Sequence, residues 1–189
     1  MSVREIVTVG DPVLRERAAE VSDVSAPAVQ ALIDDLIDTV RAADGAGLAA
    51  NQIGVLQRVA VVEVRPGNPR YPYKPLVPLT VMVNPVLEPV DGETVEINEG
   101  CLSVPDLRGT LSRHVSVRVR YLDRGGVARE EIRRGLTAGT FQHEVDHLDG
   151  VLFLDRADPR TFSTWAQFDR HHRAAFEARA RALVERVGS

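Results

Sequence analysis

Two histidines four residues apart, His143 and His147, are the side chains best placed to do chemistry together. On an α-helix of about 3.6 residues per turn they project from one face, so both imidazoles can reach a single cation. Glu144 sits beside the first histidine, where a carboxylate can contact a metal-bound water as general base and later as proton donor. The pattern predicts a metal-dependent hydrolase. The competing interpretation is an exposed helix with two incidental histidines.

Two histidines leave such a site one ligand short, because a catalytic divalent ion usually has three protein ligands and one open position. One protease class adds a histidine three residues after a glycine, but here Gly150 is followed at that spacing by Phe153. Another class adds a glutamate from a following helix, where this chain has Ala-Gln-Phe at 166–168. Cys101 remains. A thiolate binds iron, zinc, cobalt or nickel strongly, although a lone cysteine is more often a small buried apolar side chain.

A glycine-rich segment at residues 45–54 is the third candidate for chemistry. A phosphate-binding loop is disfavoured, because such loops follow a strand and end in Lys-Ser/Thr, and neither holds here. The small residues would instead let the backbone approach a ligand closely. Gln52 in this segment can offer an amide N–H to a carbonyl oxygen, as oxyanion-stabilising side chains do.

These three segments together resemble the peptide deformylase family. The family motifs Gly-x-Gly-x-Ala-Ala-x-Gln, Glu-Gly-Cys-Leu-Ser and Gln-His-Glu-x-Asp-His match residues 45–52, 99–103 and 142–147 without a gap. The resemblance runs from the first residues to about Asp155. It implies removal of the formyl group from the N-terminal formyl-methionine of newly made polypeptides, with release of formate.

The resemblance also implies roles for individual residues. Cys101, His143 and His147 would bind the metal, natively Fe(II), with zinc, nickel or cobalt as possible replacements. A metal-bound water would be the nucleophile, Glu144 the general base and acid, and Gln52 with the Leu102 backbone N–H the oxyanion donors. The residues expected to bind substrate are Gly45, Ala46, Gly47, Gly100, Leu136, Gly139 and Thr140. Gly139 and Thr140 are smaller or more polar than the aliphatic residues expected in a methionine pocket.

Four charged residues near these motifs have open roles. Glu99 and Asp146 are candidates to orient the metal ligands, although Asp146 is equally well explained as a surface charge. Arg108 and Arg113 either face the peptide or support Glu99.

Composition fits a single globular domain of 189 residues with 44% hydrophobic and 26% charged residues. The net charge of −4 disfavours a dedicated DNA-binding protein. A single cysteine excludes an intrachain disulfide and favours a reducing compartment. With no signal-like segment or apolar run long enough to span a bilayer, a cytoplasmic protein without membrane contact is expected.

Hydrophobic periodicity predicts a compact α+β domain with a trailing helix, and the resemblance implies antiparallel sheets packed around a central helix that carries the His-Glu-x-x-His motif. An amphipathic helix is expected at 26–43 with Ser25 as its cap, and Asp11-Pro12 is typical of a short helix start. The motif helix is expected at 136–149, and a long final helix from Asp158 to about Val187. Expected strands are 58–64, 79–83, 93–98, 115–122 and 128–133, with a proline-rich loop at 66–78. The catalytic domain is expected at 1–158, with 159–189 as its helical tail.

The tail at 159–189 carries six arginines against three acidic residues. It could dock on ribosomal RNA, but an amphipathic helix packed on the core is the favoured interpretation. Three rival functions stay open: an inactive deformylase-like protein with a structural metal, a metalloprotease, and a ribosome- or RNA-binding module without chemistry.

Overall fold

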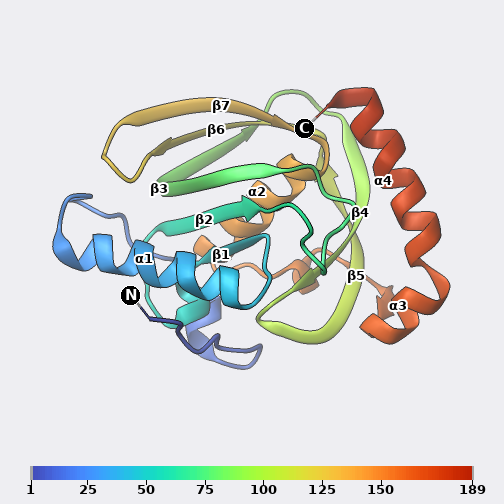
Figure 1. Cartoon of the computed structure of the whole chain (residues 1–189), viewed down its shortest axis with the longest axis horizontal. Coiled ribbons are helices and arrows are strands. Elements are labelled where there is room, and N and C mark those ends of the chain that lie inside the picture. The colour runs from blue at the N-terminus through green and yellow to red at the C-terminus, as the bar shows by residue number, and fades with distance from the viewer. Residues whose placement is uncertain (1, 189) are drawn as a thin grey trace.

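Two antiparallel sheets enclose one helix in the computed structural model, which describes residues 2–188 (Figure 1). A five-stranded sheet has the order β1-β2-β3-β6-β7, and a three-stranded sheet has the order β4-β5-β8. The strands are β1 (Gly47–Ala49), β2 (Val59–Val64), β3 (Val77–Pro89), β4 (Thr94–Cys101), β5 (Val104–His114), β6 (Ser116–Leu122), β7 (Ala128–Arg134) and β8 (Asp158–Ser163). The helices are α1 (Pro27–Ala42), α2 (Gly135–Leu148), α3 (Trp165–His171) and α4 (Arg173–Val187), with 3₁₀ turns at Pro12–Arg15, Ala50–Ile53 and Phe153–Asp155. The predicted α+β class is therefore confirmed.

The motif helix α2 lies between the two sheets and touches strands of both (Figure 1). Nearly all of its residues are buried, as expected of a helix surrounded by other elements. Phe141 and Leu148 pack against Met82 and Val117 of the large sheet, while Leu136 packs with Ile97 of β4. This position fixes the direction of every side chain that α2 carries.

Strand β2 shows why the large sheet can hold helices on both faces. Its run of residues from Val59 to Val64 is apolar at almost every position, as in a strand covered on both sides. Because side chains alternate along a strand, Val61 packs with Leu36 of α1, whereas Val62 packs in the cluster that contains α2. The sheet therefore separates α1 from α2.

Helix α1 agrees with its predicted range to one residue at each end, but the predicted cap is wrong. The N-cap position is Ala26, followed by Pro27 in the first turn, and no side chain caps the helix. The Ser25 hydroxyl donates instead to Asp23 Oδ1 at 2.6 Å. The first 3₁₀ turn does have its predicted cap, because Asp11 accepts from the Val13 backbone N–H at 2.9 Å.

The segment after α2 departs from the single long helix predicted from Asp158 to Val187. Residues 158–163 form strand β8 along β5, and α3 begins only after Thr164, whose hydroxyl accepts from the Gln167 N–H. The strand is stabilised by side chains that α-helix periodicity ignores. Thr161 Oγ1 accepts from the Thr110 N–H at 2.8 Å, and Phe162 fills the space that a side chain at Gly109 would need.

Strand β5 was not predicted at all, because Pro105 and Gly109 resemble turn residues. In the structure it pairs with β4 from Thr94 opposite His114 to Gly100 opposite Arg108. Asp106 takes a positive φ of 53° within the strand. Cys101 consequently lies at the end of a paired strand, where its position is fixed by the sheet.

Among the described residues, no helix is both long enough and apolar enough to cross a bilayer.

Candidate active site

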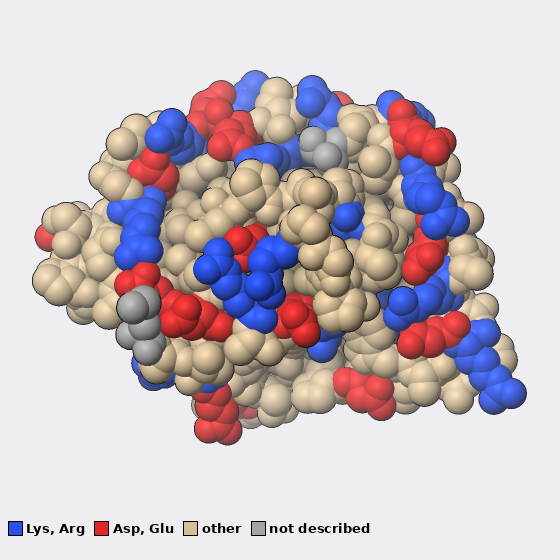
Figure 2. All heavy atoms as spheres, in the orientation of Figure 1, with Lys and Arg blue, Asp and Glu red and all other residues tan. Residues whose placement is uncertain are grey.

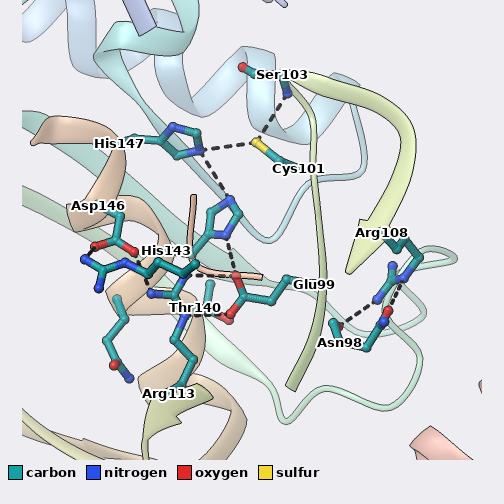
Figure 3. A network of polar contacts seen from close by, with 12 residues as sticks. Asn98, Glu99, Cys101, Ser103, Arg108, Arg113, Thr140, His143, Asp146 and His147 are labelled. Atoms are coloured by element: carbon teal, nitrogen blue, oxygen red, sulfur yellow. Dashed lines mark hydrogen bonds and ion pairs between the residues drawn. The ribbon is translucent and has the colours of Figure 1, made fainter. Parts of the chain in front are cut away.

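Three side chains converge at one point: Cys101 from the end of β4, and His143 and His147 from α2 (Figure 3). Cys101 Sγ lies 3.2 Å from His147 Nε2, which lies 3.2 Å from His143 Nε2. The three potential ligand atoms are all within 4.8 Å of one another. Ligand atoms around one tetrahedral ion at about 2.0–2.3 Å are separated by roughly 3.3–3.6 Å. The spacing therefore fits a single small divalent cation.

The charges around these atoms also fit a cation. Burial and the neighbouring His143 lower the pKa of His147 well below its ordinary value, which keeps the imidazole neutral, as a metal ligand must be. Burial would also lower the pKa of His143, but the Cys101 sulfur and the Glu99 carboxylate raise it well above normal. The site thus attracts positive charge, which a divalent ion can supply in place of a proton.

Glu99 fixes the ring of His143 through a buried ion-pair network (Figure 3). Its Oε2 lies 2.9 Å from His143 Nδ1, and Arg113 donates to both of its carboxylate oxygens at 2.8 and 2.9 Å. Asp146 accepts from the third nitrogen of the same guanidinium. Burial alone would raise the pKa of Glu99, but the Arg113 charge holds it well below its usual range. Of the two roles left open for Arg113, the structure shows support of Glu99.

Phe153 takes the place of the third histidine found in one protease class. Its ring is fully buried and stacks on the ring of His143, with centroids 6.4 Å apart and planes at 21°. Phe153 therefore packs beside the first histidine as an apolar neighbour, and the Cys101 sulfur supplies the third potential ligand atom.

Glu144 lies on α2 next to this cluster with its carboxyl group buried. Oε2 has no hydrogen-bond partner among the described residues, and burial raises the pKa of the group to about 7. A Cβ at Gly47 would lie 2.3 Å from Oε1, so only glycine lets the backbone of β1 pass this carboxyl. Glu144 is thus a buried carboxyl group next to the Cys101–His143–His147 cluster, with one oxygen that has no partner within residues 2–188.

Gln52, in the 3₁₀ turn after β1, points its amide nitrogen at the same sulfur. The Ala49 N–H donates to its Oε1 at 2.9 Å, which fixes the orientation of the amide. Its Nε2 then donates to Ser103 Oγ at 3.1 Å and approaches Cys101 Sγ to 3.5 Å. An N–H donor therefore faces the site, as predicted. Ser103, which also donates its backbone N–H to the Cys101 sulfur at 3.4 Å, was missed by sequence reasoning.

A pocket opens beside Glu144 and runs along α2 toward its N-terminus. Six of the seven residues expected to bind substrate line it: Ala46, Gly47, Gly100, Leu136, Gly139 and Thr140. Gly45 does not line it, and a Cβ there would lie 2.8 Å from Val40 and 3.0 Å from Leu102. Leu136, Gly139 and Thr140 follow His143 at helical spacing on one face of α2. A side chain at Gly139 would meet Ile97 at 2.9 Å, which explains the small residue there.

The other side of the pocket comes from residues that sequence reasoning missed. Tyr71, Tyr73 and Lys74 enter from the proline-rich loop before β3, and Phe176 enters from α4. None of them belongs to a recognisable motif. The available signal was compositional, since Lys74 is the single lysine of the chain.

Arg108 also lines the pocket, but it does not contact Glu99. Its guanidinium lies 4.1 Å from the centroid of Trp165 and 4.3 Å from that of Phe168. Its Nε donates to Asn98 Oδ1 at 2.7 Å, whereas Nη1 has no partner among the described residues. Arg108 therefore joins the small sheet to α3 and leaves one donor group at the pocket.

The fold and this cluster define a class: metal-dependent hydrolases with a His-Glu-x-x-His helix and a cysteine as the additional ligand. Residues 3–163 match the family model for polypeptide deformylase. The chain belongs to the peptide deformylase family.

Curated relatives and solved structures agree with this membership. Peptide deformylase 2 of Nostoc sp. is 46% identical over 81% of this chain and 85% of its own length. Peptide deformylase 1 of Prochlorococcus marinus is 48% identical over 82% and 81%, respectively. A class I type b peptide deformylase structure from Acinetobacter baumannii, described as Met-Ala-Ser bound, has a TM-score of 0.78 and 39% identity, covering 82% of this chain and 98% of that one.

Proposed function

We propose that this chain hydrolyses the formyl group from the N-terminal formyl-methionine of newly made polypeptides and releases formate. The observation that carries the proposal is the cluster of Cys101, His143 and His147 beside the buried Glu144, whose Oε2 has no hydrogen-bond partner among the described residues. Family membership supports the reaction. The Acinetobacter baumannii relative described as bound to Met-Ala-Ser supports a peptide with N-terminal methionine as the product.

Cys101, His143 and His147 would hold one divalent ion, and we expect Fe(II). Zinc, nickel or cobalt suit the same donors. When bound, the ion would polarise the formyl oxygen and make a water molecule more acidic. Arg113 contributes indirectly, because it keeps Glu99 charged and Glu99 fixes the ring of His143.

The chain's own residues would then move the proton and bind the oxygen. Glu144 takes a proton from the attacking water on Oε2 and returns it to the leaving amine, and its pKa near neutrality suits both transfers. The Gln52 amide N–H and the Leu102 backbone N–H stabilise the negative charge that develops on the formyl oxygen. Burial of Glu144 and Gln52 keeps bulk water away from this charge.

The pocket along α2 would receive the side chain of the substrate's first residue. Gly45, Ala46, Gly47 and Gly100 would let the peptide backbone approach closely, while Leu136, Gly139 and Thr140 would surround the side chain. Because formylated chains emerge from ribosomes, we further propose a cytoplasmic enzyme.

Ribosome contact through the helical tail stays a prediction. The buried residues of α4 pack on the core, as the amphipathic interpretation expects, and Arg186 pairs at 2.5 Å with the exposed Glu93, just before β4. Figure 2 shows basic and acidic side chains alternating along the edge where α4 lies. A docking role would therefore depend on arginines that already have acidic neighbours. Ribosome co-sedimentation of the full chain and of a chain lacking residues 159–189 would test it.

The decisive test is formate release from formyl-Met-Ala-Ser. Protein purified without oxygen should contain about one metal ion per chain and release formate at rates that depend on the metal, with iron more active than zinc. Casein cleavage without formate release would favour a metalloprotease. Bound metal without turnover of either substrate would favour the inactive deformylase-like protein.

A further inference from the structure

One wall of the pocket carries a half-buried positive charge with no part in the chemistry above. Lys74 Nζ donates to Thr140 Oγ1 at 2.8 Å and lies 4.7 Å from the ring centroid of Tyr71, in a cation–π contact. Both partners line the same pocket. Thr140 is one helical turn before His143, so the partner of the ammonium on α2 lies within one turn of the first metal-binding histidine.

The loop that carries Lys74 is held in place at both ends of the pocket. Asn68 donates to the carbonyl oxygens of Asp44 and Gly45 at 3.1 and 3.4 Å, which ties the loop to the glycine-rich segment. Tyr73 meets Phe176 of α4 edge to face at 5.1 Å. The ammonium is therefore directed into the pocket by packing on two sides.

Thr140 cannot serve a ligand as donor in place of Lys74. Its hydroxyl donates to the Leu136 carbonyl at 3.2 Å, and its oxygen accepts from the ammonium. Lys74 has three N–H groups and, within residues 2–188, one hydrogen-bond acceptor. Burial lowers the pKa of Lys74 to about 8, and the negative charges of Glu99 and Glu144 oppose that shift. The group is still mainly charged at neutral pH, with donors left over.

Building on the proposed function, we propose that Lys74 is a specificity residue that donates a hydrogen bond to the end of the substrate's first side chain. The thioether sulfur of methionine is a weak acceptor, whereas the oxygen of methionine sulfoxide is a strong one. An entirely apolar pocket would leave that oxygen buried without a partner, which is costly. With Lys74 present, the enzyme accepts formyl-methionine sulfoxide peptides as substrates alongside formyl-methionine.

Three peptides on the metal-loaded enzyme test this inference: formyl-Met-Ala-Ser, its methionine sulfoxide form, and the norleucine form, which has no sulfur. The measured quantity is kcat/KM for formate release. In the unmodified enzyme, the sulfoxide peptide should be within about threefold of the methionine peptide. Lys74→Met keeps the apolar stem and should lower the sulfoxide value about tenfold or more relative to norleucine.

Two further variants make the result specific. Arg70→Met removes a cation from the same loop that stacks on Trp165 outside the pocket, and it should leave the ratio of sulfoxide to norleucine unchanged. Thr140→Val removes the acceptor that holds the ammonium and should lower the same ratio. If circular dichroism and metal content show that Lys74→Met does not fold, Thr140→Val still tests the inference.

The inference is overturned if the unmodified enzyme disfavours the sulfoxide about a hundredfold or more, or if Lys74→Met and Thr140→Val change all three peptides equally. Failure of the proposed function looks different, because the unmodified enzyme would then release no formate from formyl-Met-Ala-Ser.

Discussion

At one end of the pocket the side chains are held by charge, and at the other end they are held by packing. The ring of His143 is oriented by Glu99, and Arg113 donates two hydrogen bonds to the Glu99 carboxylate. Lys74, at the other end, has one hydrogen bond and one aromatic contact. The first end comes from β4, β5 and α2, whereas the second depends on a loop and on α4, near the end of the chain (Figure 1).

This difference separates the reaction from the choice of substrate. A metal ligand must keep its position to within a few tenths of an ångström, and buried ion pairs provide that stiffness. A side-chain pocket needs the right shape and polarity, which loops and terminal helices can supply and vary. Substitutions at the metal end should therefore affect turnover, and substitutions at the pocket end should affect stability and specificity.

The largest expected effect is at Glu144. Glu144→Gln removes the acid–base group with little change in shape, so kcat should fall by roughly 10²–10⁴ while the metal content stays normal. Formate release and metal analysis measure the two quantities. Glu96→Gln, on the exposed face of β4, is the matched control and should behave as the unmodified enzyme. Near-normal turnover by a metal-loaded Glu144→Gln enzyme would contradict the role of this residue.

At the pocket end, Phe176→Ala should mainly cost stability. Phe176 is buried between Tyr73 and Phe168, with ring centroids at 5.1 and 5.8 Å. Removing the ring should lower the free energy of unfolding by about 3 kcal/mol or more and raise KM with kcat largely preserved. Urea unfolding and steady-state kinetics measure these effects. Glu185→Ala on the exposed side of α4 should change neither, and an equal loss there would refute the packing explanation.

Glu99→Gln tests whether the metal end depends on the charge of Glu99. The amide keeps the shape but loses the charge that orients His143 and pairs with Arg113. Metal affinity should fall by about 10–100-fold, measured by competition with a chelator. Unchanged affinity would mean that His143 is held by its packing on Phe153 alone.

The smallest expected effect is the decrease in the free energy of unfolding that the charge of Lys74 causes. Its pKa in the folded protein is about 8, compared with an ordinary value of 10.5. The unfolded chain therefore binds more protons between these values, and the free energy of unfolding should rise with pH in that window. Lys74→Met should exceed the unmodified protein in stability near pH 7, on the order of 1–2 kcal/mol given its partial exposure.

That advantage should shrink toward zero near pH 10, where the lysine is losing its charge in the unfolded chain as well. Urea unfolding of both proteins at the two pH values measures the difference. A constant difference at both pH values would show that the substitution acts through packing and not through charge.

The side chains that the sequence assigned to the metal end do lie together in the structure, because they belong to three short motifs with fixed local geometry. His143 and His147 needed only the period of a helix, and the absence of a further histidine at Phe153 pointed to Cys101. For Arg113 the sequence left two roles open, contact with the peptide or support of Glu99. Its partnership with Glu99 depends on the pairing of β4 with β5, and β5 was hidden by Pro105 and Gly109.

The pocket end was not predictable in the same way. Lys74, Tyr71 and Phe176 come together only through tertiary structure, and nothing in the local sequence pairs a proline-rich loop with a final helix. The tail misled for a related reason: Asp158-Pro159 resembles a helix start, whereas pairing with β5 makes the segment a strand. In this segment, hydrogen bonds to the neighbouring strand determine the structure, and the local helix propensity does not.

The position of the three ligands has a consequence for how the chain matures. Cys101 belongs to the small sheet, whereas both histidines belong to a helix that packs against the large sheet. Cys101 and His147 are 46 residues apart in the sequence. No partly folded chain with separated layers can gather all three, so the ion binds tightly only after the layers have met around α2. Metal occupancy should therefore report completed folding, because incompletely folded chains would bind the ion only weakly.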